Sequence, residues 1–458
     1  MRDSQGANWP DSYPGIPVAR MGWNRIHALT LAALCTSSLP VGCGLATLQS
    51  NLDDIDFAEV RGSVSVQDWN ESPVVVGVLR LADVDGAPDQ PVTRRELIEP
   101  GEFVFYLPPG RYRIAAWEDT NHNLEWDEAE ERVGGYNGLR PFELRAGERR
   151  GRVDIHITVR RLSEVPDIAE LDLARLGVSI GTVVALSHGR FAPPSGRRGL
   201  WQPMQFLDDP GWGIFMLEEY DPDKVPVLFV HGMGGHPQEF ARLIDGLDRA
   251  RLQPWVVHYP SGLDLEILAL AIQNVLSELR HRHGYERMCL VAHSAGGVLS
   301  RLLLRNHREE EGRFVRTFVS IVSPFNGVPS AGRAASSAPV VLPAWRDLDP
   351  SGRTIPTLFD ARLPEGLDYH LFFAHQDGSS DTVVSLGSQL RAEAMAEATT
   401  LRGFSNTHAG ILRDSQTSER LNAALRRCSG LPPIVAIAPT MSIPIRVAPY
   451  GNQYSAGK

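Results

Sequence analysis

The sequence of 458 residues lacks the features that mark several classes of protein. It has no CxxC pair of the kind that binds zinc or carries out thiol redox chemistry. It has no basic stripe or Lys/Arg-rich arm, and its net charge is −10, so nucleic acid is not expected as a partner. No internal repeat occurs, and no apolar run is long enough to span a bilayer. The composition, 43% hydrophobic, is that of a globular protein, and the length corresponds to two or three domains.

The N-terminus is typical of an export signal. Basic residues flank the short apolar stretch 26–34, IHALTLAAL, and the sequence PVGC follows at 40–43. PVGC resembles the lipobox of bacterial lipoproteins. The resemblance implies a signal within residues 1–43, a lipidated Cys43 and attachment to a membrane of the cell envelope. Because Pro40 departs from the usual first residue of the box, a periplasmic or secreted protein without lipid stays the alternative.

An all-β domain is predicted for residues 57–162, after a polar tether at 44–56. Short alternating runs such as 74–81 and 110–117 are separated by Gly, Pro and Asp, as in a small sandwich. The segment 101–121, GEFVFYLPPGRYRIAAWEDTN, is similar to transthyretin-like and carboxypeptidase-regulatory-like sandwich domains.

The sequence pattern changes in residues 163–428, where strands and helices are predicted to alternate. Apolar runs such as 225–232 and 318–325 lie between helical patterns, which indicates a mostly parallel sheet covered on both faces. The fold class is therefore α/β, preceded by the small all-β domain. We expect a linker or short helix at 163–176, a Pro/Gly/Arg-rich loop at 191–199 and a loosely ordered tail at 429–458.

Ser294 is the candidate nucleophile. It lies in VAHSAGG, where the strand pattern 288–293 changes to a helix pattern. A serine on such a tight turn needs small residues two positions before and two after it, and Ala292 and Gly296 meet that need. The alternative is a serine that merely caps a helix.

Two backbone N–H groups are expected to stabilise an oxyanion. One belongs to Ala295, which follows the nucleophile at the start of the helix. The other is assigned to Met233, in the glycine-rich segment HGMGGHPQEF at 231–240. A phosphate cradle is the alternative for this segment, but neither GxGxxG nor a P-loop lysine is present.

These segments together resemble those of the α/β-hydrolase lipases. VLFVHGMGG, VVHYPSG, LVAHSAGG, SPFNGVPSA, GSSDTVVSL and THAGIL follow in the order of small bacterial triacylglycerol lipases and the GPI inositol-deacylase-like group. The resemblance covers residues 225–412 and implies an acid after a late strand, then a histidine. Asp381 matches the acid, with Asp377 as its competitor, and His408 matches the base.

We assign structural roles to several other residues of this region. His231 and His293 flank key positions and are interpreted as shaping the loops, and His236 is a candidate for lining the pocket. The segment 330–345 has the length of a short lid. Cys289 is interpreted as a small buried hydrophobic residue, with a Cys289–Cys428 disulfide as the alternative.

A second constellation lies in the β-domain, at DTNHNLEWDEAE. Its oxygen ligands have the spacing of a calcium loop: Asp119, Asn121, Asn123, Glu125 through its carbonyl, Asp127 and Glu130. Leu124 stands where such loops carry glycine. A structural calcium and an acidic, solvated loop are both open, and no cofactor is expected for catalysis.

Together these features predict an exported serine hydrolase that cleaves an ester or lipid-like substrate through an acyl-enzyme. The alternatives are an acyltransferase or thioesterase with the same triad, and a non-catalytic envelope-binding protein on a hydrolase scaffold. The sequence determines neither the natural substrate nor the oligomeric state.

Overall fold

The computed structural model describes residues 57–81, 89–121, 124, 126–127, 131–158, 178–208, 212–306, 314–338, 340–376 and 378–429. The predicted signal with Cys43, the tether, the linker at 163–176 and the tail from residue 430 lie outside these residues.

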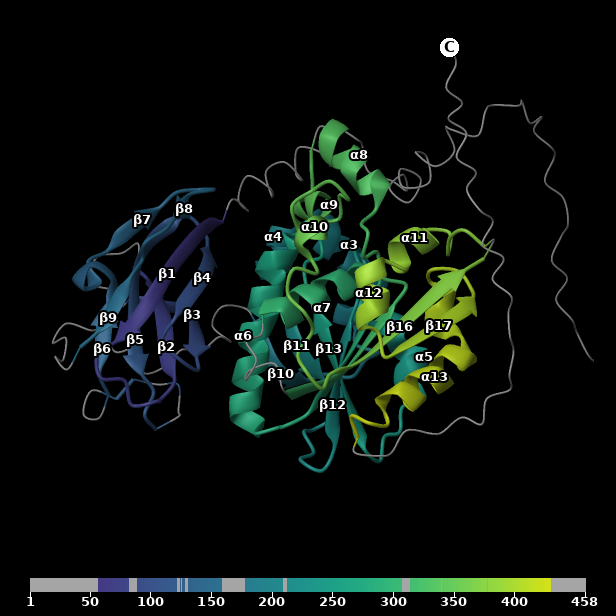
Figure 1. Ribbon diagram of the computed structural model, residues 1–458, viewed down its shortest axis with the longest axis horizontal. Coiled ribbons are helices and arrows are strands. Elements are labelled where there is room, and N and C mark those ends of the chain that lie inside the picture. Colours follow the sequence, from purple (N-terminus) through teal and green to yellow (C-terminus); the bar gives the residue numbers. More distant parts are fainter. Residues whose placement is uncertain are drawn as a thin grey trace, which may run out of the picture.

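Two sheets packed face to face form the N-terminal domain (Figure 1). One has the order β4-β1-β8 with β9 beside β1, and the other has the order β3-β2-β5-β6 with β7 beside β5. The strands are β1 (Ala58–Val66), β2 (Val74–Arg80), β3 (Gln90–Leu97), β4 (Glu102–Leu107), β5 (Gly110–Glu118), β6 (Val133–Gly135), β7 (Phe142–Leu144), β8 (Arg149–Arg150) and β9 (Ile155–Ile157). The short helix η2 (Tyr136–Leu139) follows β6. Alternate residues of β4 point inward, so Phe103, Phe105 and Leu107 share one core with β2 and β5.

An eight-stranded sheet with the order β10-β11-β13-β12-β14-β15-β16-β17 forms the second domain. Its strands are β10 (Val178–Val183), β11 (Trp212–Met216), β12 (Val225–Val230), β13 (Leu252–His258), β14 (Met288–His293), β15 (Val315–Ile321), β16 (Asp368–His375) and β17 (Thr400–Ser405). All neighbours from β13 to β17 are parallel, and β11 runs antiparallel to β13. The predicted α/β class with a mostly parallel sheet is confirmed.

Helices cover both faces of this sheet. The longer ones are α6 (Leu265–His283), α7 (Ala295–Asn306) and α13 (Ser415–Leu425), and the short ones are α4 (Pro203–Asp208), η5 (Pro237–Phe240), α5 (Ala241–Asp245), α8 (Pro329–Ser337), α9 (Pro343–Asp347), α10 (Thr354–Thr357), α11 (Leu386–Gln389), α12 (Ala392–Glu397) and η7 (Gly410–Arg413). One core packs α6 and α7 on the sheet, and a second packs α5 and α13 on the opposite face. The caps of α6 follow its sequence: the Asp264 carboxylate accepts from two N–H groups of the first turn, and Gly284 ends the helix at φ 64°.

The predicted loop at 191–199 is wrong. Residues 189–191 form η4 (Gly189–Phe191), and α3 (Pro193–Trp201) follows, with proline at its start, where a missing N–H costs nothing. The glycines that suggested a loop allow close packing instead. A Cβ on Gly196 would lie 2.3 Å from the carbonyl oxygen of Gly235, so only glycine fits here.

Cys289 and Cys428 form a disulfide, with an S–S distance of 2.10 Å and a Cα–Cα distance of 6.2 Å. The interpretation of Cys289 as an unpaired hydrophobic residue is therefore wrong in part. Both cysteines are fully buried in the core that carries α5 and α13, so burial alone would not have distinguished the two states.

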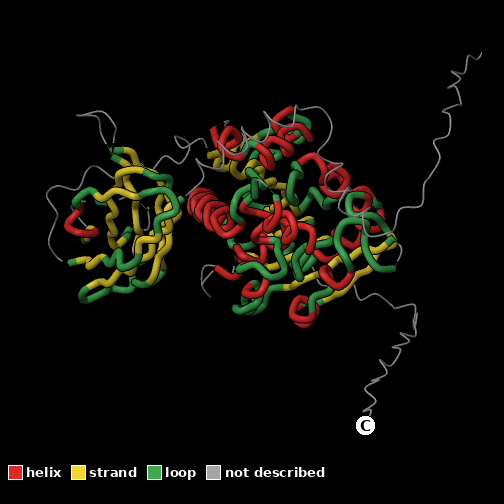
Figure 2. Tube along the Cα trace, turned by 90° about the horizontal axis from the view of Figure 1, so that it is seen from above, coloured by secondary structure: helices red, strands yellow, loops and turns green. Residues whose placement is uncertain are grey.

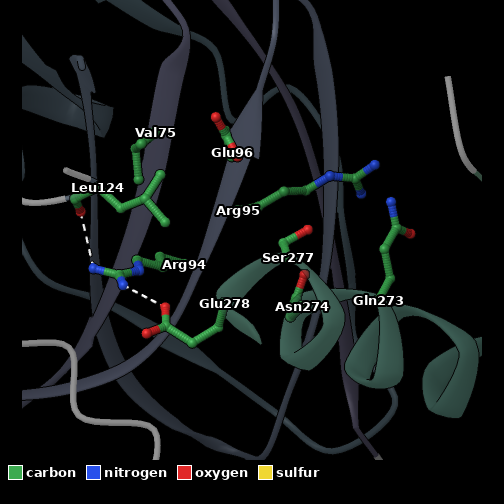
Figure 3. A pocket seen from close by; sticks show the side chains of 9 residues that line it. All are labelled: Val75, Arg94, Arg95, Glu96, Leu124, Gln273, Asn274, Ser277 and Glu278. Carbon is green, nitrogen blue, oxygen red and sulfur yellow. Dashed lines mark hydrogen bonds and ion pairs between the residues drawn. The ribbon is translucent and has the colours of Figure 1, made fainter. Parts of the chain in front are cut away.

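The two domains lie side by side (Figure 2), and α6 faces the β-domain (Figure 1). The main polar contact is an ion pair of 2.6 Å between Arg94 of β3 and Glu278 of α6, with both side chains about 10% exposed (Figure 3). Arg94 also donates to the carbonyl of Leu124 at 2.9 Å, and Asn274 donates to the Thr93 hydroxyl at 3.3 Å. Arg94 therefore joins α6 to the predicted calcium loop.

The segment predicted as a lid contains α8 and α9, which lie with α10 at one end of the second domain (Figure 1). Trp345 of α9 packs edge-on against Trp201 of α3, with ring centroids 6.0 Å apart. Leu342 is fully buried in the same small cluster. The segment is thus held against α3. Among the residues described, no helix is long and apolar enough to cross a membrane.

Candidate active site

Ser294 lies on the turn between β14 and α7. Its φ of 54° is in the left-handed region, which non-glycine residues rarely adopt and which a nucleophile elbow requires. The small residues around it have a steric reason. A Cβ on Gly296 would lie 2.4 Å from the carbonyl oxygen of His231, and a Cβ on Gly297 would lie 1.9 Å from the Ser323 hydroxyl. The helix can therefore start close to the neighbouring strand only with glycine at both positions.

The structure brings Ser294, His408 and Asp381 together in one chain of hydrogen bonds. The Ser294 Oγ lies 2.9 Å from Nε2 of His408, and Nδ1 of His408 lies 2.6 Å from Oδ2 of Asp381. The three residues are separated by 114 and 27 positions in the sequence. They meet because parallel strands end at the same edge of the sheet, and each residue follows the end of one such strand.

Asp381 is held firmly in place. Its Oδ1 accepts from the N–H groups of Val383 at 2.9 Å and Val384 at 2.7 Å, and the side chain is completely buried. Its carbonyl also accepts from the N–H of His408 at 2.7 Å. These contacts fix the carboxylate so that its Oδ2 faces the imidazole. Asp377, the competing acid, lies outside the described residues.

Burial lowers the pKa of His408 below its ordinary 6.5, the hydrogen bond that His408 donates to Asp381 acts in the opposite direction, and neighbouring His293 lowers the pKa further. The imidazole is therefore neutral at neutral pH. A neutral imidazole with Asp381 on Nδ1 has its lone pair on Nε2, which faces the serine hydroxyl. This is the state that can accept a proton.

The predicted oxyanion loop lies against the serine. A Cβ on Gly232 would lie 2.8 Å from the Cβ of Ser294, so the chain before Met233 passes directly beside the nucleophile. The N–H of Gly234 donates to the Ser261 hydroxyl at 2.8 Å, which fixes the next turn of the loop. On the other side, Ala295 opens α7, and the first N–H groups of a helix have no partner within it. The structure thus places Ala295 and Gly232, which directly precedes Met233, next to Ser294.

The order of these parts along the chain decides the fold. Counted within the second domain, the glycine loop follows the third strand, the serine the fifth, the aspartate the seventh and the histidine the eighth. A serine on a strand-to-helix turn, with a donor loop after the third strand and the order Ser, Asp, His, defines one architecture. The domain has the α/β-hydrolase fold.

The sequence matches no protein-family model and no curated protein. Among solved structures, the chain is similar to Bacillus licheniformis lipase BlEst2 in its mature form, with 17% identity and a TM-score of 0.38 over 45% of this chain and 96% of that one. It is also similar to the lin2722 gene product of Listeria innocua (16% identity, TM-score 0.37, 45% and 95% covered) and to Aspergillus fumigatus lipase B (16%, 0.37, 46% and 55%). The α/β-hydrolase assignment depends on the strand order and the elbow described above.

The predicted calcium loop is described only in part, because Asn123, Glu125 and Glu130 lie outside the described residues. Asp119 is buried and accepts from the N–H of Leu124 at 3.0 Å. Leu124 has a φ of 61°, so it adopts the conformation for which such loops use glycine. No group of three or more His, Cys, Asp or Glu able to hold a metal occurs among the residues described. Calcium binding stays a prediction.

Sequence reasoning missed two features of the hydrolase domain. A second serine–histidine pair links Ser195 of α3 to His258 of β13, with Oγ 3.0 Å from Nε2. A carboxylate–histidine pair links Glu239 of η5 to His293, at 3.4 Å. Neither pair has a sequence signal, because their members are far apart along the chain and only the tertiary fold joins them.

Proposed function

We propose that this protein is an exported serine hydrolase of the lipase or carboxylesterase type, with Ser294, His408 and Asp381 as its catalytic residues. The observation that carries the proposal is the continuous hydrogen-bond chain from the Ser294 hydroxyl through His408 to the buried Asp381. It combines a nucleophile, a base and a group that orients the base in the arrangement that acyl transfer needs.

The reaction follows from these positions. Ser294 Oγ attacks the ester carbonyl carbon, and its proton passes to Nε2 of His408. The negative charge that develops on the carbonyl oxygen is stabilised by the N–H groups of Met233 and Ala295. When the intermediate collapses, the C–O bond to the alcohol breaks and His408 returns the proton to the leaving oxygen. Water then attacks the acyl-enzyme, again through His408, and releases the acid and the free serine.

Reaction with a fluorophosphonate probe tests this assignment. The wild-type protein should be labelled on Ser294, because only an activated serine attacks the phosphorus at a useful rate. The variant Ser294→Ala should remain unlabelled and retain the wild-type melting temperature. A folded wild-type protein that takes up no probe would remove the serine-hydrolase assignment.

Ester or lipid-like substrates are proposed for this site. An apolar cover joins Trp201 of α3 and Trp345 of α9 to Leu342, which directly precedes α9. Such a cover suits an acyl chain. A series of p-nitrophenyl esters of increasing chain length would measure this, and a rate that falls steadily beyond acetate would argue against a lipid-like acyl group.

Export to the cell envelope is part of the proposal. It is supported by the signal-like N-terminus and by the buried Cys289–Cys428 disulfide, since disulfides persist in oxidising compartments. Attachment through a lipid on Cys43 would be detected by metabolic labelling with palmitate. Labelling that is unchanged in Cys43→Ser would contradict it.

Calcium in the β-domain is also a proposal, with a structural role only. Candidate ligands are Asp119, Asn121, Asn123, Glu125, Asp127 and Glu130. Two features support it: the ligand spacing, and the left-handed Leu124 between the first and last ligands. Removal of the ion with EDTA should lower the melting temperature, and re-addition of calcium should restore it. An unchanged melting temperature would count against the ion.

A further inference from the structure

His293 directly precedes the nucleophile and contacts the loop that carries His408. Its Nε2 lies 3.0 Å from the carbonyl oxygen of His408, and the two rings are 4.8 Å apart. A carbonyl only accepts, so Nε2 of His293 must carry a proton and donate it. Since the N–H of His408 donates to Asp381 at 2.7 Å, the backbone of His408 is held on both sides.

The other nitrogen of His293 faces Glu239. Nδ1 lies 3.4 Å from Oε1 of Glu239, and the side chains are only 7% and 18% exposed. Neither atom has a hydrogen-bond partner elsewhere among the described residues. A bare nitrogen facing a carboxylate would place two lone pairs against each other in a poorly solvated site. A proton on Nδ1 removes this conflict, and His293 is then positively charged.

Nearby groups leave His293 as the partner of this carboxylate. Burial opposes ionisation of Glu239, but the hydrogen bond and charge of His293 hold its pKa below the usual value. Burial lowers the pKa of His231 to about 4 and also lowers that of His236. Arg197 and Arg413 act on His236 in the same direction. Both histidines are therefore neutral at neutral pH and supply no compensating charge.

Glu239 also braces the oxyanion loop. Its Oε2 accepts from the N–H of His236 at 3.5 Å, and a Cβ on Gly235 would lie 3.0 Å from the same oxygen. The carboxylate thus touches the glycine loop, and through His293 it reaches both the nucleophile elbow and the backbone of His408.

We propose that Glu239 and His293 form a buried ion pair that positions His408 and cancels the effect of the Glu239 charge on its imidazole. The inference rests on the proposed role of His408 as the base. The groups that face His408 are Ser294, Asp381, His293 and, one step further, Glu239. Because the pair is neutral as a whole, it holds the backbone without a large net effect on the charge of the imidazole.

The Glu239–His293 ion pair is tested by the acid limb of the pH profile of kcat/KM, which is the fall in kcat/KM at low pH. His293→Gln keeps an N–H donor for the His408 carbonyl but removes the positive charge, which leaves Glu239 unbalanced. A nearby negative charge favours the protonated imidazole, so the acid limb should move to higher pH by about one unit. In the double variant His293→Gln/Glu239→Gln the limb should return close to that of wild type. A purely structural role would lower the rate without this rise and return.

His293→Leu tests the positioning role, because it removes the donor as well as the charge. Its kcat at the pH plateau should fall roughly tenfold or more, while KM changes little and His293→Gln retains most of the rate. Equal plateau rates for Leu and Gln would show that the hydrogen bond to His408 has no positioning role.

A direct measurement covers the case in which a variant fails to fold. In wild-type protein labelled with ¹⁵N-histidine, one imidazole should carry protons on both nitrogens at the pH of the kcat plateau. Its signal should vanish in His293→Gln. If every histidine is singly protonated at that pH, or if the acid limb of His293→Gln does not move, the ion pair is wrong. A wild-type protein that fluorophosphonate does not label overturns the proposed function instead.

Discussion

The hydrolase domain contains two serine–histidine hydrogen bonds of nearly equal length, 2.9 Å for Ser294–His408 and 3.0 Å for Ser195–His258. Their surroundings differ. His408 has a carboxylate on its second nitrogen, whereas Nδ1 of His258 lies 3.4 Å from Nε2 of His231. Ser294 lies on a strained turn beside donor N–H groups, and Ser195 lies inside α3 at 8% exposure. A short serine–histidine distance therefore does not identify a nucleophile.

The group that contacts the second imidazole nitrogen explains most of the difference between the two pairs. A carboxylate there stabilises the imidazolium that forms when the base takes a proton. At His258, burial holds the pKa well below 6.5, and Nδ1 faces His231 instead of a carboxylate. His258 is thus suited to hold α3 on the sheet, and His408 is suited to move a proton.

Replacing each of the two histidines should give the largest difference between the pairs. His408→Gln removes the base, and kcat/KM for a p-nitrophenyl ester should fall by roughly 10⁴-fold or more. His258→Gln should keep the rate per folded molecule within about threefold but lower the free energy of unfolding by about 1–3 kcal/mol, since a buried hydrogen bond is disturbed. A large loss of rate in folded His258→Gln would give the second pair a catalytic role.

Asp381 is the group that the second pair lacks. Asp381→Asn should lower kcat by about 10⁴-fold, because an amide can hold the wrong tautomer of His408 and does not stabilise the imidazolium. The control is Asp377→Asn, which should leave kcat within a few-fold of wild type. If the two effects were reversed, the acid would be Asp377. Steady-state kinetics on both purified variants decide this.

The contact between the oxyanion loop and the serine is the next feature that only the first pair has. Gly232→Ala would put a methyl group 2.8 Å from the Ser294 Cβ, so the loop must shift and kcat should fall by roughly 10²-fold. Gly387→Ala, where a Cβ meets no atom within 4 Å, is the matched control and should leave kcat unchanged. Equal rates for the two variants would mean that the loop does not set the donor positions.

The sequence was sufficient for the α/β class because its signals are local. Apolar strands, the turn around Ser294 and the glycines after β12 can each be recognised within about ten residues. Asp381 and His408 came from a resemblance, and the structure brings both to Ser294. The Cys289–Cys428 disulfide, the Ser195–His258 pair and the Glu239–His293 pair depend on distances between remote segments. The helix at 193–201 was missed because its glycines serve packing, a reason that is visible only once Gly235 lies against Gly196.

The pH dependence also distinguishes the two pairs, because each pair should respond in a different measurement. Protonation of His408 stops proton transfer, so kcat/KM should fall as the pH drops through its depressed pKa, at a midpoint below 6.5. The buried pair should instead report through stability. His258 and His231 stay neutral when folded, and the pKa of His231 is about 4, while in the unfolded chain both take up protons near pH 6.5. The unfolded state then binds more protons between about pH 6.5 and 4, so the free energy of unfolding falls as the pH is lowered through that window, by roughly 3 kcal/mol for His231 alone.

Urea unfolding at several pH values measures this window. His258→Gln should reduce the pH dependence of the free energy of unfolding while the contribution of His231 remains, and His281→Gln, at an exposed position on α6, should leave it as in wild type. The acid limb of kcat/KM should stay in place in both variants, because neither residue touches His408. If His258→Gln moved that limb and left the stability curve unchanged, the two pairs would be coupled, and the distinction drawn between a proton-transfer pair and a packing pair would fail.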